Sequence, residues 1–536
     1  MTKKTMYNLA TLIERNASFR GDRTALIFND EKLDYRTLNT LINRAANHLR
    51  NLGVKPDDKI ALSCPNNPAF VIAYYAIQKV GAVTVPLNVM LKGTEVTYHL
   101  DDSDAIAFIC YEGNSALPSG EYGYEGFSQA ERCQHFICIP SGSELQMALP
   151  TEQPNEQSAP THNAPQYHNF GSWLTDTDND HFEAIFRRAE DTCVILYTSG
   201  TTGRAKGAEL TQSNMLCNAQ ACQALLNQKG TDVSMAILPL FHTFGQSLIL
   251  NTSMLAGSAL VLIPRFVPKL VIQQMYEHKV THIAGVPTMF IGLLAFAEKH
   301  GGEDIIEIAK HLKVAISGGA SMPVEVLKQF EEKLNVPVIE GYGLSESSPV
   351  AAFNHLEFER KPGSIGQPLA GVSMKVIDDQ GNTVPAGAEG ELLIRGHNVM
   401  KGYYKKPEET AKTVVNGWLH TGDIVRIDEE GYVYVVDRLK EVIIRGGFNI
   451  YPRDIEETFM AHPDIQMIAV IGVPHKSYGE EAKAFVILKD GAKVSAKELV
   501  QWGKARLADY KYPRLIDIVE ELPMTATGKI LKRMLK

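Results

Sequence analysis

A loop rich in glycine and hydroxyl side chains follows a short apolar run of the chain. The run is Cys193–Tyr197, whose β-branched and aliphatic residues predict a buried strand, and the loop is Thr198–Lys206. The loop offers backbone N–H groups that glycine leaves unobstructed, four hydroxyl groups, and the cations Arg204 and Lys206. This set of donors suits a polyphosphate. The candidate phosphate-binding residues are Thr198, Ser199, Gly200, Thr201, Thr202, Gly203 and Lys206.

The spacing of this loop disfavours one large class of nucleotide-binding protein. No GxxxxGK[ST] pattern can be fitted to it, so a P-loop NTPase is not the expected reading. The structural alternative is a flexible turn of serine, threonine and glycine, which the preceding strand and the two cations disfavour. Taken alone, the loop indicates only that phosphate binds here.

Six further segments follow in order toward the C-terminus. Together with the loop they resemble the motifs of AMP-forming acyl-CoA synthetases, members of the adenylate-forming superfamily that includes luciferases and peptide-synthetase adenylation domains. Ala205 stands where the signature loop often has proline, and Ser345 stands where another motif often has threonine. The resemblance covers nearly the whole chain apart from residues 113–170. The six segments are Leu238–Gly245, Ser317–Pro323, Gly341–Glu346, Gly417–Asp423, Asp437–Lys440 and Pro523–Ile530.

The resemblance implies a role at ATP for each of these segments. Tyr342 would stack on adenine, and Asp423 and Arg438 would lie at the ribose. Glu346 would hold magnesium, and Lys529 would be the lysine of the adenylation step. The implied set is completed by Gly319, Ala320, Gly343 and Ser345 at the nucleotide and by His242, which would border the acyl site and join Lys529 and Glu346 as a catalytic residue.

Each polar residue among the candidates also has a purely structural interpretation. Lys529 lies in a tail rich in lysine and arginine, where a lysine is usually a solvated charge. Asp423 follows a glycine and can be a turn residue, and Glu346 can offset a helix dipole. His242, flanked by phenylalanines, can be a packed core residue.

A glycine pair just past the hinge motif implies a second half-reaction. The segment Arg445–Pro452 resembles the family segment that moves over the active site for thioester formation with coenzyme A. Gly446 and Gly447 would let the backbone approach a narrow pantetheine arm, whereas a glycine hairpin turn is the structural alternative. We expect the small C-terminal domain to swing about Lys440 between the two steps.

The region expected to line the acyl pocket favours an apolar acid. Residues Phe241–Leu250 contain no aspartate to anchor an amino group, so an amino acid substrate is disfavoured. A medium- or long-chain fatty acid is the first expectation, and an aryl or cinnamic acid is the second. An acyl-AMP ligase that loads a carrier protein is a further alternative. A non-catalytic nucleotide-binding protein would be expected to lack Lys529 and Glu346, and both are present.

Alternating strands and helices must position these motifs. Apolar residues at helical spacing predict a helix over Tyr35–Leu52, and Ala69–Leu87 is predicted to form a buried helix followed by a strand. This alternation predicts an α/β protein with mainly parallel sheets. Other predicted strands are Lys59–Ser63, Ala105–Cys110, Ala259–Ile263, Met467–Val473, Ala482–Leu488 and Leu515–Val519, and other predicted helices are Pro452–His462 and Ala496–Asp509.

The predicted helices and strands change in length and pattern toward the C-terminus, and this change predicts two domains. Residues 1–436 are expected to form a large N-terminal domain of layered α/β subdomains, and residues 441–536 a small, mobile α+β lid joined by a hinge at 437–440. Residues 113–170 are rich in Ser, Gln, Glu and Gly, with four prolines in the second half. We expect this segment to be a surface insertion.

Composition limits the partners of the chain. The 536 residues carry a net charge of −9, which argues against broad binding of nucleic acid. The seven cysteines are odd in number and form no CxxC pair, as expected of reduced thiols in a cytoplasm. No secretory signal or membrane span is expected. The expected partners are a carboxylic acid, ATP with Mg²⁺, and coenzyme A; a homodimer is an assembly that the sequence leaves open.

Overall fold

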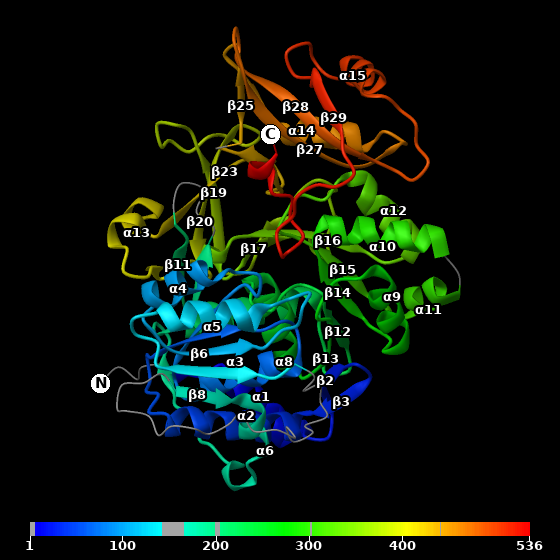
Figure 1. Cartoon of the computed structure of the whole chain (residues 1–536). Helices are drawn as coiled ribbons and strands as arrows, with labels where there is room; N and C mark the ends of the chain where they lie inside the picture. Colours follow the sequence, from blue (N-terminus) through cyan, green and yellow to red (C-terminus); the bar gives the residue numbers. More distant parts are fainter. Residues whose placement is uncertain (1–5, 142–165, 199–203, 301–302, 440, 536) are drawn as a thin grey trace. The chain divides into compact units, whose positions relative to one another are not determined.

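The computed structural model describes residues 6–141, 166–198, 204–300, 303–439 and 441–535, which group into two compact units (Figure 1). The first unit comprises Met1–Ala284, Gly343–Val350 and His397–Lys412. The second comprises Gly285–Tyr342, Ala351–Gly396 and Thr413–Lys536. This grouping does not test the predicted boundary around residues 437–440, which stays a prediction.

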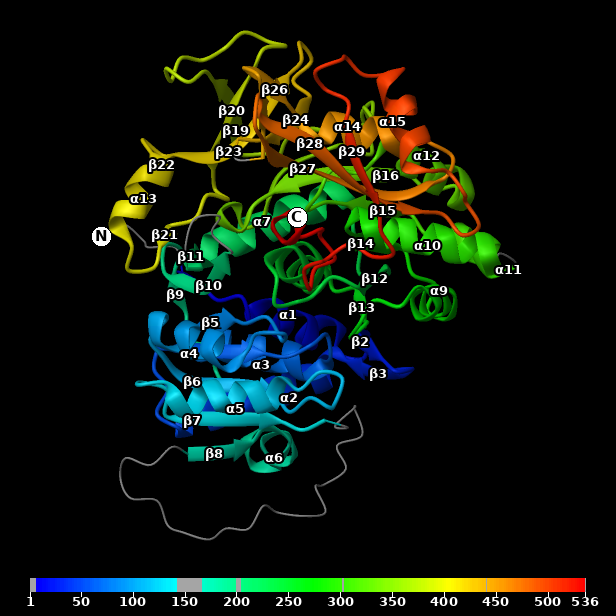
Figure 2. The ribbon, with the colours of Figure 1, turned by 45° about the horizontal axis from the view of Figure 1, so that its top comes forward.

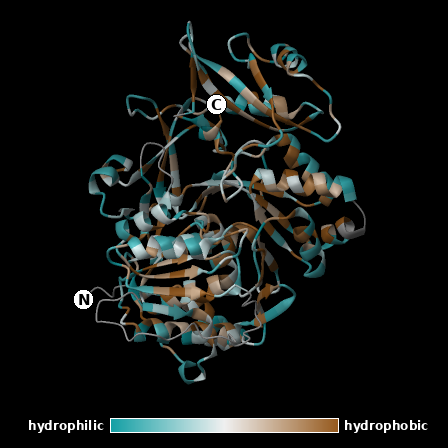
Figure 3. Cartoon of the chain, in the orientation of Figure 1, coloured by the Kyte–Doolittle hydropathy of each residue, from teal (hydrophilic) through white to brown (hydrophobic). Residues whose placement is uncertain are grey.

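An eight-stranded sheet is the centre of the first unit, in the order β21-β11-β10-β5-β4-β6-β7-β8. Neighbours from β10 to β8 run parallel, whereas β11 is antiparallel to both β10 and β21. Its strands are largely coloured as hydrophobic in Figure 3, as expected of a parallel sheet that is covered on both faces. The strands are β4 (Lys59–Ser63), β5 (Val83–Pro86), β6 (Ala105–Tyr111), β7 (His135–Ile139), β8 (Gln166–Asn169), β10 (Thr192–Thr198), β11 (Lys206–Thr211) and β21 (Gly402–Tyr403).

Helices α4 (Gly93–Asp102) and α5 (Ser119–Gln129) pack on this sheet. Val96 of α4 and Phe127 of α5 share one apolar core with Phe108 of β6 and Phe136 of β7. Figure 2 shows the two helices beside the strands that they cover. The other helices of the unit are α1 (Thr11–Arg20), α2 (Tyr35–Asn51), α3 (Pro68–Lys79), α6 (Phe170–Thr175), α7 (Gln212–Leu226), α8 (Thr252–Ala256) and α9 (Pro268–Glu277).

A second set of strands in the first unit has the order β14-β12-β13-β2-β3. All of these pairs are parallel except the hairpin of β2 and β3. A π-helical segment, Phe244–Asn251, follows β12 in the chain and is buried throughout. The strands are β2 (Thr24–Phe28), β3 (Glu31–Asp34), β12 (Val233–Ala236), β13 (Ala259–Leu262) and β14 (His282–Gly285).

The second unit combines a parallel pair with an antiparallel sheet and a mixed sheet, in which β29 runs parallel to β28 and the other neighbours are antiparallel. Strands β15 (Val314–Ser317) and β16 (Val338–Gly343) run parallel. One sheet has the order β19-β20-β23-β22 with β24 also on β23, and the other has β26-β25-β28-β27 with β29 also on β28. Their strands are β19 (Val372–Ile377), β20 (Glu389–Gly396), β22 (Val414–Val415), β23 (Trp418–Ile427), β24 (Val433–Arg438), β25 (Ile443–Arg445), β26 (Phe448–Ile450), β27 (Ile465–His475), β28 (Gly479–Leu488) and β29 (Leu515–Ile518).

The predicted α/β class is confirmed, and the predicted helices and strands form within a few residues of their expected limits. Helices α14 (Pro452–Met460) and α15 (Ala496–Lys504) start where they were expected. Ser495 caps α15 by accepting a hydrogen bond from the N–H of Glu498, whose carboxylate accepts one from the N–H of Ser495 in return. Within the described residues, no helix combines the length and the apolar character needed to cross a membrane.

Residues 113–170 differ from the surface insertion that was expected. The described first half contains α5 and β7, and β8 follows at Gln166–Asn169, so part of the segment belongs to the eight-stranded sheet. Phe127, Phe136 and Cys138 are buried there. Residues 142–165, which hold the four prolines, lie outside the described residues. The expectation of an insertion is therefore wrong for the part from α5 to β7.

Candidate active site

The phosphate-loop motif begins and ends on two paired strands of the first unit. Thr198, the last residue of β10, lies opposite Lys206, the first residue of β11, and the two strands are antiparallel. The motif is therefore the connection of a hairpin at one end of the central sheet. Ser199, Gly200, Thr201, Thr202 and Gly203 lie outside the described residues.

Lys206 at the start of β11 is held by an acidic and an aromatic side chain. Its Nζ lies 2.5 Å from Oε2 of Glu409 and 5.1 Å from the centre of the Tyr403 ring. The hydrogen bond and the charge of Lys206 lower the pKa of the Glu409 carboxyl, which therefore stays ionised. The cation is thus placed at the loop before any phosphate binds.

The same tyrosine connects the loop to Glu346. Tyr403 donates a hydrogen bond of 2.9 Å to Oε1 of Glu346, which lies in the short 3₁₀ turn Ser345–Ser347. Motif comparison did not single out Tyr403 and Glu409, because their contacts join distant segments: Glu409 is 203 residues from Lys206, and Tyr403 is 57 residues from Glu346. The structure thus brings Thr198, Lys206, Ser345 and Glu346 into one unit and leaves their predicted roles as predictions.

In the second unit, three predicted residues form one hydrogen-bonded group. Asp423 of β23 and Arg438 of β24 are register partners, and Arg438 Nε lies 3.2 Å from Asp423 Oδ1. The hydroxyl of Tyr342 donates to Oδ2 of the same carboxylate. Only 3% of Asp423 is exposed, and burial raises its pKa against the opposing charge of Arg438. The group presents a buried, fixed acceptor of the kind that sugar hydroxyls require.

The C-terminal loop places Lys529 beside Gly319. Gly319 has a φ of +81°, which favours glycine, and a Cβ built on it would lie 2.8 Å from Cε of Lys529, so a larger residue would displace the lysine side chain from this position. The loop is a tight turn in which the N–H of Thr525 donates to the Lys529 carbonyl at 2.7 Å. Thr288 fixes it by donating to the Gly528 carbonyl at 2.7 Å.

The environment of Lys529 changes its acidity. Burial lowers its pKa to about 8, and the positive charge of Arg438 acts in the same direction, while Asp423 acts against both. Because the surroundings of Lys529 are partly desolvated, an anion that reaches the protonated amine interacts with it more strongly than it would in water. The second unit thus collects Gly319, Ala320, Tyr342, Asp423, Arg438 and Lys529, whereas Gly343 lies at the start of a segment of the first unit.

The buried carboxyl group of Glu340, which motif comparison missed, contacts the Ser317–Pro323 segment. Glu340 of β16 lies opposite Ser317 of β15, and its Oε1 accepts a 2.9 Å hydrogen bond from the N–H of Met322. The side chain is buried, and Oε2 has no hydrogen-bond partner among the described residues. Burial raises the pKa of Glu340 to about 7.

Replacement of Glu340 should change how stability depends on pH. Because the pKa of Glu340 is higher in the folded protein than in the unfolded chain, its protonated form contributes to the free energy of unfolding. This contribution is complete below the ordinary pKa of 4.5 and is lost as the pH rises through about 7. Glu340→Gln removes the ionisation, so its stability relative to the unaltered protein should rise by about 2 to 3 kcal/mol between pH 5 and pH 8. Urea unfolding at both pH values measures the difference. Glu332→Gln, an exposed site on α12 (Val324–Leu334), is the control, and equal pH responses of the two variants would contradict the assignment.

For the remaining predicted residues, the structure shows the backbone conformation or a single hydrogen bond. His242 is half-buried, and its Nδ1 accepts a 3.3 Å hydrogen bond from the N–H of Phe244. Gly446 and Gly447, with φ of +59° and +86°, form the two-residue turn between β25 and β26. The backbone therefore has the conformation of a glycine hairpin turn, which was the structural alternative. The contact of this turn with a pantetheine arm stays a prediction. Lys440 lies outside the described residues.

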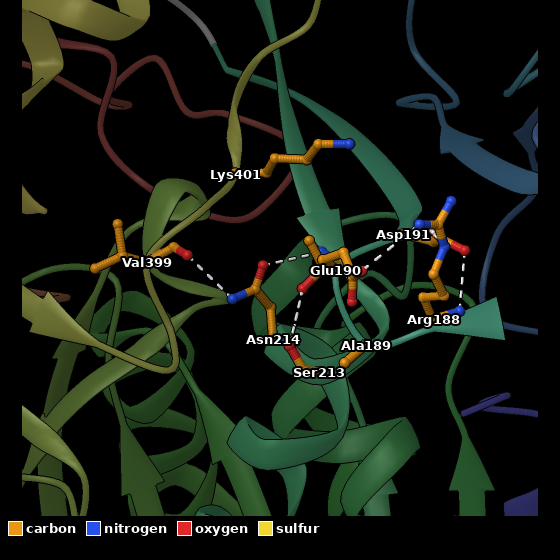
Figure 4. Close-up of a pocket in the computed structure, with 9 residues that line it drawn as sticks. Arg188, Ala189, Glu190, Asp191, Ser213, Asn214, Val399 and Lys401 are labelled. Carbon is orange, nitrogen blue, oxygen red and sulfur yellow. Dashed lines mark hydrogen bonds and ion pairs between the residues drawn. The ribbon is translucent and has the colours of Figure 1, made fainter. Parts of the chain in front are cut away.

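A pocket of about 450 Å³ lies at the other end of the central sheet (Figure 4). It includes Thr211, the register partner of Thr192 at the start of β10, whereas the phosphate loop follows Thr198 at the end of that strand. Seven strand residues span roughly 20 Å, so this pocket is separate from the loop. Its lining residues, none of them a predicted site residue, are Arg188, Ala189, Glu190, Asp191, Thr211, Ser213, Asn214, Val399 and Lys401.

Comparisons with known proteins match nearly the whole chain. The AMP-binding enzyme family model covers residues 13–404, and the model of the AMP-binding enzyme C-terminal domain covers residues 454–529. A long-chain-fatty-acid–CoA ligase of Bacillus subtilis (strain 168) is 35% identical over 98% of this chain and 94% of its own. A feruloyl-CoA synthase of an Amycolatopsis species is 32% identical over 97% and 96%.

A solved structure resembles the chain over the same length. The anthranilate CoA ligase AuaEII in complex with anthranoyl-AMP is 29% identical, with a TM-score of 0.86 over 99% of this chain and 96% of that one. The two family models cover most of the chain, and the relatives match it over nearly its full length. The chain therefore belongs to the AMP-binding enzyme family and is an AMP-forming acyl-CoA synthetase.

Proposed function

We propose that this protein activates a medium- or long-chain fatty acid in two steps. In the first, the carboxylate displaces pyrophosphate from ATP to give an acyl-adenylate, and in the second, the thiol of coenzyme A displaces AMP to give the acyl-CoA. The observation that carries the first step is the group in the second unit, where Lys529 lies half-buried beside Gly319. The relatives named as fatty-acid–CoA ligases support the second step and the substrate.

Charge neutralisation is the main requirement of the first step, because a carboxylate anion must approach a polyanion. Lys529 would hold the attacking carboxylate against the α-phosphate, and its partial burial strengthens that interaction. Asp423, with Tyr342 and Arg438, would hold the ribose. Lys206 and the hydroxyl groups of Thr198, Ser199, Thr201 and Thr202 would hold the pyrophosphate as it leaves.

Glu346 is the proposed ligand of Mg²⁺. A carboxylate oxygen suits this hard cation, and the hydrogen bond from Tyr403 to Oε1 fixes the side chain while Oε2 is available for a metal. When bound, the ion supplies positive charge that neutralises the phosphates. Lys206 would bring a second cation to the same polyanion from the paired strand β11.

The second step requires coenzyme A to reach the acyl-adenylate. The turn at Gly446 and Gly447 suits a narrow pantetheine arm, because a Cβ placed on Gly447 meets no atom within 4 Å and the backbone is therefore bare. We propose that residues 441–536 move about Lys440 between the steps and that residues 1–436 form the other domain. We place the reaction in the cytoplasm, supported by seven cysteines that all carry free thiols.

The acyl pocket supports an apolar acid. Phe244–Asn251 is buried throughout and contributes no carboxylate to the region next to His242. An aryl acid is the second candidate, because the feruloyl-CoA synthase is nearly as similar to the chain as the fatty-acid ligase is. These two classes differ in shape rather than in charge, so a comparison of substrates separates them.

One assay tests the proposed function. The protein is given ATP, Mg²⁺ and a panel of octanoate, palmitate, cinnamate, ferulate and benzoate, and acid-dependent exchange between ATP and pyrophosphate is measured. We expect exchange with the fatty acids, and AMP release that depends on coenzyme A. Activity confined to the aryl acids would contradict the substrate assignment. Exchange without any reaction with coenzyme A would indicate transfer to a carrier protein, and release of phosphate in place of pyrophosphate would overturn the mechanism.

A further inference from the structure

Helix α4 contacts both ends of the phosphate loop through side chains of its last turns. We propose that Tyr98 of this helix is a positioning residue, which holds the returning end of the loop in the form that binds the phosphates of ATP. The inference rests on the proposed function and adds a residue that none of the family motifs contains. Tyr98, His99 and Asp102 are the side chains concerned.

The incoming end of the loop is held at Tyr197. Its hydroxyl donates a 2.8 Å hydrogen bond to Oδ2 of Asp102, and its ring meets the ring of His99 edge-on, with centroids 4.5 Å apart. Burial and the negative charge of Asp102 raise the pKa of Tyr197, so the phenol stays protonated and remains a donor. The residue before Thr198 is therefore fixed to the helix.

The returning end is held at Arg204 and Ala205. The hydroxyl of Tyr98 donates a 2.7 Å hydrogen bond to the carbonyl of Ala205, and the guanidinium of Arg204 lies 5.4 Å from the centre of the Tyr98 ring. Both contacts act on the two residues that precede Lys206. Because Lys206 is the first residue of β11, the Tyr98 contacts determine where the loop rejoins the sheet.

The helix is a rigid base for these contacts. Val96 and Leu100, on its opposite face, are buried in the core of the eight-stranded sheet. Tyr98 and Asp102 are four residues apart and so project from the same side of the helix. A displacement of either loop end would have to break a hydrogen bond to an element that is itself fixed by packing.

The identity of residue 205 explains why such a contact is useful. A proline at this position would fix its own φ and restrict the loop before ATP binds, whereas alanine leaves that freedom. The hydrogen bond from Tyr98 to the Ala205 carbonyl restricts the same residue from outside. A proline at position 205 and the hydrogen bond from Tyr98 should therefore substitute for each other. A pair of variants can test this expectation.

The first variant is Tyr98→Phe, which keeps the ring against Arg204 and removes only the hydroxyl. We expect the Kd of ATP, measured by calorimetry on the whole chain without any acid, to rise roughly three- to tenfold, because the hydrogen bond to the Ala205 carbonyl is lost. The KM for the acid should not change. Tyr124→Phe on α5, where the side chain is largely exposed, is the matched control and should leave both constants unchanged.

The second variant is Ala205→Pro in the Tyr98→Phe background. We expect it to restore most of the affinity for ATP, while Ala205→Pro alone changes the affinity of the unaltered protein less. An unchanged Kd for ATP in Tyr98→Phe would overturn the proposal, and so would a rise that is matched by lower thermal stability and not rescued by Ala205→Pro. Because ATP binding is measured directly, these results are distinct from a failure of the proposed function, which would appear as no exchange with any acid in the unaltered protein.

Discussion

Lys529→Ala should lower the rate of acid-dependent exchange between ATP and pyrophosphate by at least ~10²-fold. The lysine lies beside Gly319 in the second unit, in a turn that its backbone bonds to Thr525 define. Those bonds use main-chain atoms of residue 529, so alanine leaves the turn intact and removes only the ammonium group. The loss should therefore appear in kcat, because the charge acts where the two anions meet.

The pH dependence gives an independent readout of the same residue. Burial lowers the pKa of Lys529 to about 8, so the protonated amine that the reaction needs is present below this pH and is lost above it. In the unaltered protein, kcat/KM for ATP should fall as the pH rises through about 8. Lys529→Arg keeps a charge at all these pH values and should remove that fall, although its longer side chain will lower the maximal rate.

A matched lysine separates this effect from a general loss of positive charge. Lys328 is exposed on α12 of the same unit, and Lys328→Ala should exchange pyrophosphate at the unaltered rate. Exchange at the unaltered rate in Lys529→Ala would remove this lysine from the mechanism. An alkaline fall that persists in Lys529→Arg would assign the titration to another group.

The sequence was sufficient for features that depend on neighbouring residues. The strand before the phosphate loop, β10, and the start of α15 at Ala496 are both local features, and each has its own residue pattern. The Gly446–Gly447 turn is of the same kind, because two consecutive residues with positive φ favour glycine whatever surrounds them. Local patterns of this kind, together with the order of the motifs, predicted the α/β class.

Contacts between distant segments could not be predicted in this way. Tyr403 reaches Glu346 and Lys206 only because β21 pairs with β11. Since β21 has two residues, it is too short to show the alternating pattern that would predict a strand. Glu409 is one of two acidic residues in the first turn of α13 (Pro407–Thr413) and is distinguished from Glu408 by its contact with Lys206. Nothing in the sequence around Glu340 shows that its carboxyl group is buried, because the burial follows from the pairing of β16 with β15 and from the contact with Met322.

The error at residues 113–170 has a related cause. The composition of the whole segment is polar, and this average concealed the apolar run His135–Ile139, which becomes β7 once it pairs with β6. Four residues of that strand are buried, although its flanks are rich in polar residues. A short strand between parallel neighbours needs only a few apolar residues, so composition over a long window is a weak guide to it.

Glu346→Gln should lower kcat/KM for ATP by about 10²-fold and raise the Mg²⁺ concentration needed for half-maximal exchange. The amide keeps the size of the side chain and can still accept the hydrogen bond from Tyr403, so the difference reports the loss of one carboxylate charge.

Tyr403→Phe provides a graded comparison, because it keeps the carboxylate and removes only the donor that orients it. Its Mg²⁺ requirement should rise by about tenfold, at the lower end of the effect of losing a group that orients a metal ligand. Glu408→Gln, at an exposed carboxylate on α13, controls for the net charge of this region and should leave the Mg²⁺ requirement unchanged. If Glu346→Gln and Glu408→Gln need the same Mg²⁺ concentration, Glu346 is not the metal ligand, and its place in the 3₁₀ turn is explained by the dipole of that turn and by the hydrogen bond that holds it to β21.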